Sequence, residues 1–121
     1  MSLQKLNFAI FGNIYQADKS AGIQQVLHSL KERMAGVSME KTFYDFLVKT
    51  RGLRLDGVSV FDGNYENADF VISIGGDGTL LRSAYCVGDR CTPIIGVNMG
   101  RLGFLAGVSV EEIDEVLDNI Y

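Results

Sequence analysis

The sequence predicts an α/β fold, an open and mostly parallel sheet with helices on both faces. Short apolar runs alternate along the chain with stretches of helical spacing, which is the pattern of strand–helix units. The runs are continuous rather than alternating, as expected for strands covered on both sides. Glycine-rich loops at 75–79 and 98–103 directly follow two of these runs. In parallel sheets, ligands bind beyond the carboxyl ends of the strands, so we expect both loops to lie at one edge and to face one pocket.

The first half of the chain contains strand and helix signals in alternation. The apolar run 6–11 ends in glycine and predicts the first strand. Residues 18–33 carry apolar side chains at helical spacing, and Asp18 or Ser20 can cap this helix. The other elements expected here are a strand at 37–40, a helix at 42–49 and a strand at 58–61.

The second half repeats the alternation. An apolar strand is expected at 70–74, a helix at 79–87 and a short buried strand at 94–97. Ser109 and Glu112 have the spacing of a capping box and predict the start of a last helix. The apolar stripe of that helix consists of Val110, Ile113, Val116, Leu117 and Ile120.

Composition excludes several classes of protein. At 121 residues the chain is expected to be one domain. Its net charge is −4 and its basic residues are scattered, which argues against nucleic-acid binding. No apolar run approaches the ~20 residues that cross a bilayer. The two cysteines, without a signal-peptide pattern, favour the reducing cytoplasm. We therefore expect a cytoplasmic protein that binds neither nucleic acid nor membranes, and no metal ligated by protein side chains.

The loop at 75–79, Gly-Gly-Asp-Gly-Thr, has the composition of a phosphate-binding turn. Gly75 and Gly76 permit unusual backbone angles and close approach of a ligand. Gly78 and Thr79 place N–H groups at a helix start, where the helix dipole favours an anion. Thr79 can add its hydroxyl, and Arg82 lies one turn further along, where it can reach a phosphate. The loop matches neither the dinucleotide fingerprint nor the Walker A pattern.

The role of Asp77 is a separate question, because an acid beside phosphates is repulsive unless a cation or a proton transfer compensates. Two roles fit. It can accept the proton of an attacking hydroxyl, or it can hold Mg²⁺ through water. The structural alternative is a tight turn whose aspartate caps the next helix. The strand before the loop and the helix after it favour the functional interpretation.

These motifs carry a family likeness. Residues 75–81, Gly-Gly-Asp-Gly-Thr-Leu-Leu, resemble the signature shared by NAD kinases, diacylglycerol and sphingosine kinases, and phosphofructokinases. Residues 96–105, Gly-Val-Asn-Met-Gly-Arg-Leu-Gly-Phe-Leu, resemble the Gly-Ile-Asn-x-Gly-x-Leu-Gly-Phe-Leu segment of NAD kinases. Lipid kinases are instead expected to have an Asn-Glu pair soon after the first motif. The likeness to NAD kinases is strong over about residues 69–106.

The resemblance implies a Rossmann-like, phosphofructokinase-like amino-terminal domain of a kinase. Such a transferase moves a phosphate from ATP, or from polyphosphate, to the 2′-hydroxyl of the adenosine ribose of NAD and so makes NADP. Asp77 matches the proton acceptor, and Phe104 matches an aromatic that packs by the adenine, although composition alone makes Phe104 a core residue. Mg²⁺ is implied, held through the phosphates. The implied nucleotide-binding residues are Gly75, Gly76, Asp77, Gly78, Thr79, Leu81, Arg82, Asn98 and Phe104.

The resemblance also bears on domain organisation. NAD kinases have a second, mostly β domain, so residues 1–121 are expected to be a single α/β nucleotide-binding domain without that carboxy-terminal domain. The helix at 109–121 is then expected to lead towards it, and its apolar face to dock on that domain or on another subunit of a homo-oligomer. Two other functions stay open: the catalytic domain of a lipid kinase, and a non-enzymatic nucleotide-binding module.

The isolated 121-residue chain is expected to have negligible kinase activity, because much of the NAD pocket would lie in the second domain. The measurement is NADP formation by the purified chain with ATP, Mg²⁺ and NAD. Readily measured NADP would contradict the expectation.

Overall fold

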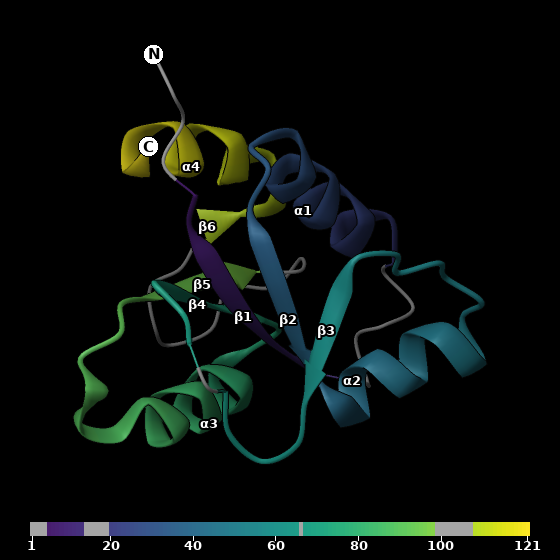
Figure 1. Cartoon of the computed structure of the whole chain (residues 1–121), viewed down its shortest axis with the longest axis horizontal. Coiled ribbons are helices and arrows are strands. Elements are labelled where there is room, and N and C mark those ends of the chain that lie inside the picture. The colour runs from purple at the N-terminus through teal and green to yellow at the C-terminus, as the bar shows by residue number, and fades with distance from the viewer. Residues whose placement is uncertain (1–4, 14–19, 66, 99–107) are drawn as a thin grey trace.

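The computed structural model describes residues 5–13, 20–65, 67–98 and 108–121, and the side chains of residues 20, 77, 98 and 110 lie outside this description. Over these residues the strands form one six-stranded sheet in the order β3-β2-β1-β4-β5-β6 (Figure 1). Every neighbouring pair in it is parallel. This is the strand order of Rossmann-type sheets, so the predicted fold class is confirmed.

The strands are β1 (Asn7–Gly12), β2 (Gly36–Glu40), β3 (Val58–Phe61), β4 (Phe70–Ile74), β5 (Ile94–Asn98) and β6 (Val108–Ser109). The α-helices are α1 (Ser20–Glu32), α2 (Lys41–Asp45), α3 (Asp77–Val87) and α4 (Ile113–Ile120). Shorter turns are the π-helical η2 (Phe46–Thr50) and the 3₁₀-helical η3 (Gly88–Arg90) and η4 (Val110–Glu112).

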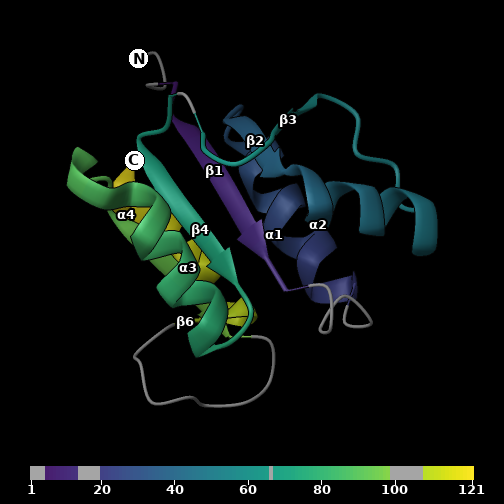
Figure 2. The same cartoon turned by 90° about the horizontal axis from the view of Figure 1, so that it is seen from below.

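Helices cover both faces of the sheet, because side chains of each central strand alternate between two cores. In β1, Phe8 and Ile10 join the core shared with α1, α2 and α4, whereas Ala9 and Phe11 join the core that includes residues of α3. Figure 2 shows α1 and α3 on opposite sides of the sheet. A strand covered on both faces is apolar at nearly every position, which explains the continuous runs in the sequence; buried Ser73 in β4 is an exception.

The outer strands are less completely covered. On the α3 side of the sheet, β2 and β3 present Ser38 and Ser59, and a polar groove of about 700 Å³ runs past them. The groove is also lined by Asn7 and Asn64. Strand β3 is exposed on both faces, at Ser59 on this side and at Val60, 44 % exposed, on the other, which is why its hydrophobic pattern is weaker than that of β1 or β4.

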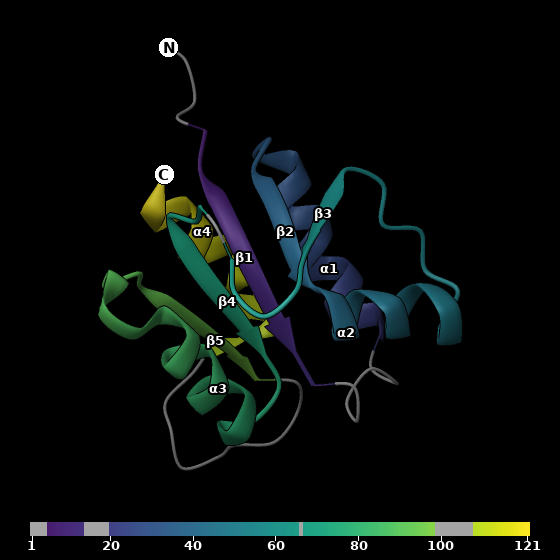
Figure 3. The ribbon, with the colours of Figure 1, turned by 60° about the horizontal axis from the view of Figure 1, so that its bottom comes forward.

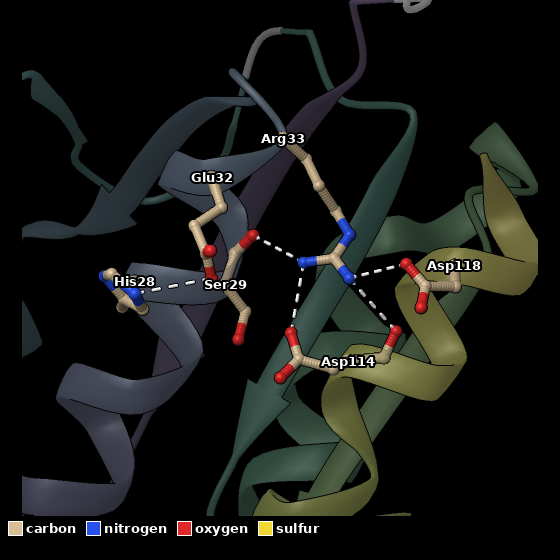
Figure 4. A network of polar contacts seen from close by, with 6 residues as sticks. All are labelled: His28, Ser29, Glu32, Arg33, Asp114 and Asp118. Carbon is tan, nitrogen blue, oxygen red and sulfur yellow. Dashed lines mark hydrogen bonds and ion pairs between the residues drawn. The ribbon is translucent and has the colours of Figure 1, made fainter.

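Charged side chains join α1 to α4 (Figure 4). Arg33, just beyond α1, donates to the Ser29 carbonyl at 2.8 Å, to Asp114 Oδ1 at 3.1 Å and to Asp118 Oδ1 at 2.6 Å. A hydrogen bond from the Ser29 side chain and the nearby Arg33 guanidinium keep the pKa of Asp114 below its usual value. The carboxylates are more than half exposed, so these contacts orient α4 more than they stabilise it.

The burial of α4 corrects one expectation. Ile113 and Leu117 are fully buried in the core that α1 and α2 also form. These two residues of the expected apolar stripe are thus covered within this domain, and the half-buried Ile120 packs against the same core. The Ser109–Glu112 pair is present, with Glu112 Oε1 accepting from Ser109 N at 3.1 Å and from its hydroxyl at 2.9 Å. It lies at the start of η4, which continues directly into α4, with Glu112 as the N-cap residue of α4.

Most of the predicted elements are confirmed, with three differences besides the division of the last helix into η4 and α4. The helix expected at 79–87 begins two residues earlier, at Asp77. The helix expected at 42–49 is divided into α2 and η2. Strand β6 was not predicted, because its two residues are held only by pairing with the end of β5. Among the described helices, none is long and apolar enough to cross a membrane.

Replacing Ile113 by alanine tests the packing of α4. Because Ile113 is fully buried, the variant is expected to lose about 2–5 kcal/mol of unfolding free energy. Glu115→Ala, on the exposed side of the same helix, is the control and should change it by less than about 0.5 kcal/mol. Urea unfolding followed by circular dichroism measures both. Equal stabilities of the two variants would show that α4 does not belong to this core.

Candidate functional site

The centre of the sheet contains a point where the strand order reverses. From β1 the chain moves through α1 to β2, and from β4 it moves through α3 to β5, in opposite directions across the sheet. The helices after β1 and β4 lie on opposite faces, and sheets of this order bind ligands in the crevice between the carboxyl ends of two such strands. Figure 3 shows these ends and the start of α3 at the same edge. Asn13 N donates to the Ile74 carbonyl across this junction at 3.2 Å.

The predicted phosphate loop lies at this crevice. Strand β4 ends at Ile74 and α3 begins at Asp77, so Gly75 and Gly76 alone connect them. Gly76 is the N-cap residue, and its carbonyl accepts the Leu80 N–H at 3.1 Å. The N–H groups of the first helical turn have no acceptor within the helix. An eleven-residue helix therefore directs its positive end towards the crevice, which is an arrangement suited to a phosphate.

Gly75 is required by both space and backbone angle. Its φ is +153°, and a Cβ built on it would lie 2.8 Å from Thr79 Oγ1 and 3.0 Å from Asn13 Cβ. Thr79 is itself buried, with only 4 % of its surface exposed. In this structure the Thr79 side chain supports the loop from the inside. The backbone carbonyl of Thr79 accepts a hydrogen bond from the Ser83 hydroxyl at 2.8 Å, which links the first turn of α3 to the next.

Arg82 lies in the same crevice and is bonded to two other elements. Its Nη2 donates to the Gly12 carbonyl at 2.9 Å and to Glu40 Oε1 at 2.7 Å. It thereby joins α3 to the carboxyl ends of β1 and β2. The Arg82 side chain is 45 % exposed and that of Glu40 is 19 % exposed, and a pair this accessible contributes at most about 1 kcal/mol. Glu40 was not among the predicted site residues. Its position at the carboxyl end of a predicted strand was the one feature of the sequence that could have indicated it.

The remaining predicted residues are placed unevenly. Leu81 is 62 % exposed beside the loop, and Gly78 is exposed as well. Asn98 ends β5, which pairs with β4, so its backbone lies at the same edge. The Asp77 backbone begins α3, but its side chain, that of Asn98 and the whole of Phe104 fall outside the described residues. The structure thus places the backbone of the first glycine loop and the backbone of Asn98, the first residue of the second loop, at the same edge of the sheet.

No metal centre is visible in the part of the chain that the structure describes: it contains no group of three or more His, Cys, Asp or Glu side chains able to hold an ion. Both cysteines are free. Burial raises the pKa of the Cys86 thiol, which makes it less reactive.

Comparison with known proteins identifies the family. Residues 8–121 match the ATP-NAD kinase N-terminal domain. The chain belongs to the NAD kinase family. It is 45 % identical over 116 residues to the NAD kinase of Bacteroides fragilis, covering 96 % of this chain and 40 % of that protein.

Other NAD kinases are similar at lower identity. The enzyme of Porphyromonas gingivalis is 36 % identical over 112 residues, and that of Cytophaga hutchinsonii is 35 % identical over 115 residues. Each match covers 93 % of this chain and 39 % of the relative. The chain therefore spans about 40 % of the length of these curated relatives. Membership of this family does not favour the lipid-kinase alternative.

Replacing Gly75 and Gly78 by alanine should have opposite effects on stability. Gly75→Ala brings a Cβ into contact with Thr79 and Asn13 at an unfavourable φ, so a loss of more than about 1 kcal/mol is expected. Gly78 lies inside α3 with no atom within 4 Å of its built Cβ, so alanine there should stabilise by about 0.5–1 kcal/mol. Urea unfolding of both variants measures the difference. If Gly75→Ala is as stable as Gly78→Ala, the loop does not have this geometry.

Proposed function

We propose that the protein is an NAD kinase, which transfers a phosphoryl group from ATP to the 2′-hydroxyl of the adenosine ribose of NAD and so produces NADP. One observation carries the proposal: a glycine turn and a helix N-terminus meet at the reversal point of the sheet, in a chain of the NAD kinase family. Inorganic polyphosphate is the alternative donor. NAD and ATP are the expected partners, and a homo-oligomer in the cytoplasm is the expected form of the full-length protein.

The backbone would bind the phosphates. The first-turn N–H groups of α3 supply fixed donors, and Gly75 and Gly76 let a phosphate approach the main chain without a side chain between them. Mg²⁺ bound to the phosphates would neutralise the charge that develops during transfer. Fixed donors that need no rearrangement favour the transition state, since phosphoryl transfer depends mainly on position and charge.

Asp77 would accept the proton of the 2′-hydroxyl. It is the first residue of α3, where the positive end of the helix dipole favours the ionised carboxylate. Such a carboxylate is a weak base, but a loose phosphoryl-transfer transition state needs little proton abstraction before the phosphorus–oxygen bond forms. Position therefore matters more than basicity, and a residue fixed at the first turn of a helix is held in position by the backbone.

Asp77→Asn in the full-length protein is expected to lower kcat by about 10²–10⁴-fold, because the amide cannot accept the proton. The KM for NAD should change much less, since the backbone donors remain. Asp89→Asn, an exposed change of the same kind beyond the other end of α3, is the matched control and should leave both constants unchanged. Steady-state NADP formation measures them.

Two results would count against the proposal. Full activity in the Asp77→Asn variant would remove Asp77 from catalysis and contradict its proposed role as proton acceptor. A wild-type protein that forms no NADP with either ATP or polyphosphate would contradict the kinase activity itself.

A further inference from the structure

The crevice contains an ion pair whose acidic member, Glu40, has no role in the proposed reaction. Arg82 Nη2 lies 2.7 Å from Glu40 Oε1 and 2.9 Å from the Gly12 carbonyl. Glu40 and Arg82 are 42 positions apart in the sequence and come from different layers, the end of β2 and the second turn of α3. The pair therefore crosses the end of β1, where the crevice opens.

The backbone of Glu40 is fixed by the sheet. Its backbone pairs with Phe61 of β3 at the last position of β2, and the next residue already begins α2. As the N-cap residue of α2, Glu40 makes no capping hydrogen bond with its side chain. The neighbouring Lys41 is paired with Asp45 at 2.9 Å. The Glu40 carboxylate is thus directed to Arg82 rather than to its own helix.

The second acceptor is equally fixed. A Cβ built on Gly12 would lie 2.3 Å from two carbons of the Phe43 ring, so only glycine lets the end of β1 pack against α2. Phe43 is buried in the core. The carbonyl of Gly12 and the carboxylate of Glu40 therefore form two acceptors whose separation is set by the core, and the guanidinium is held between them.

This arrangement leaves Arg82 able to bind something more. A guanidinium carries five N–H donors in a fixed fork, more than two acceptors on one nitrogen can use, and the side chain is 45 % exposed. Forked donors suit phosphate oxygens. A pair so accessible to water adds little to stability, so its main consequence is the position and orientation of the guanidinium next to the glycine loop.

We propose that Glu40 is a positioning residue, which holds Arg82 over the end of β1 so that its remaining donors meet a phosphate of the nucleotide bound at the glycine loop. The inference rests on the proposed function, since that function supplies the phosphate. An arginine already ordered before binding loses less side-chain entropy when the ligand arrives. Glu40 thereby strengthens nucleotide binding without touching the nucleotide.

The test is a double-mutant cycle in the full-length protein. Glu40→Gln should raise the KM for one nucleotide on the order of tenfold, with kcat within about twofold, because the guanidinium loses its charged anchor. Arg82→Ala should raise the same KM, and adding Glu40→Gln to it should change nothing further. Separate titrations of NAD and ATP show which nucleotide supplies the phosphate. Glu32→Gln, which removes an exposed carboxylate paired with His28 on α1, is the control for charge and should behave as wild type.

Further measurements distinguish a positioning role from a purely structural or a masking role. If the pair is purely structural, breaking it lowers the thermal midpoint of unfolding, and the effects of the two substitutions on KM are additive. Additive effects on KM, or a lower midpoint without coupling in KM, overturn the proposal. A lower KM in Glu40→Gln would show that Glu40 masks Arg82. An unchanged KM for both nucleotides would show that Glu40 does not affect nucleotide binding. Either result overturns the proposal. If Glu40→Gln does not fold, Glu40→Asp, with the carboxylate withdrawn by one methylene, replaces it and should raise the KM by a smaller factor.

The outcome is independent of the kinase assay. Calorimetric titration of NAD and of ATP into wild type and Glu40→Gln measures binding without turnover. Weaker binding in the variant supports the inference even where no NADP forms, whereas equal binding contradicts it even where the wild type is an active kinase. Absence of NADP formation by the wild type contradicts only the proposed function.

Discussion

The arrangement of the crevice depends on one steric constraint, the close contact of Gly75 with Thr79 and Asn13. A Cβ at Gly75 would lie 2.8 Å from the Thr79 hydroxyl and 3.0 Å from Asn13 Cβ. This contact lets β4 pass into α3 through only two residues, which brings the helix N-terminus to the end of the strand. The same turn is fixed from the sheet side, where Gly75 N donates to the Val97 carbonyl at 3.1 Å. A longer turn would move the helix dipole away from the crevice, and the effect of that dipole is confined to the first turn.

Charge balance in the crevice follows from this geometry. The helix N-terminus and Arg82 contribute positive charge, and Glu40 and the backbone carbonyl of Gly12 hold Arg82 in place. Without an anchor, a long arginine side chain on α3 would sample many rotamers, and ordering it would oppose nucleotide binding. Glu40 cancels part of the positive charge, but it also orders the Arg82 side chain. The fixed backbone donors of the first helical turn keep the region favourable for an anion despite this loss.

Local signals in the sequence were sufficient to predict the central units. The stretch 70–79 contains a continuous apolar run, two glycines and a helical pattern in succession, and each signal lies within a few residues of the structure that it specifies. The early start of α3 at Asp77 has a local cause, because aspartate and glycine are poor inside a helix but are tolerated in its first turn.

Features that depend on distant residues could not be predicted in this way. Strand β6 exists through the pairing of Val108 with Val97, and the contact of Arg33 with Asp114 spans 81 positions. The Glu40–Arg82 pair, 42 positions apart, is the corresponding case in the candidate site: Arg82 was expected to reach a phosphate, and the carboxylate that orients it had no sequence motif. The burial of α4 was missed for the same reason, since an amphipathic stripe shows that a helix packs but not on what.

The strand order also shows how one sheet can serve two modes of nucleotide binding. In dinucleotide-binding sheets of this order, the glycine turn follows the first strand and an acid about 20 residues further on binds a ribose hydroxyl. Here the glycine turn follows β4, on the other side of the same reversal point. An acid is still present at the end of β2, but Glu40 bonds Arg82 of α3. With the glycine turn after β4, the end of β2 faces the side of α3. In the site that we propose, an acid at this position acts on the ligand through an arginine.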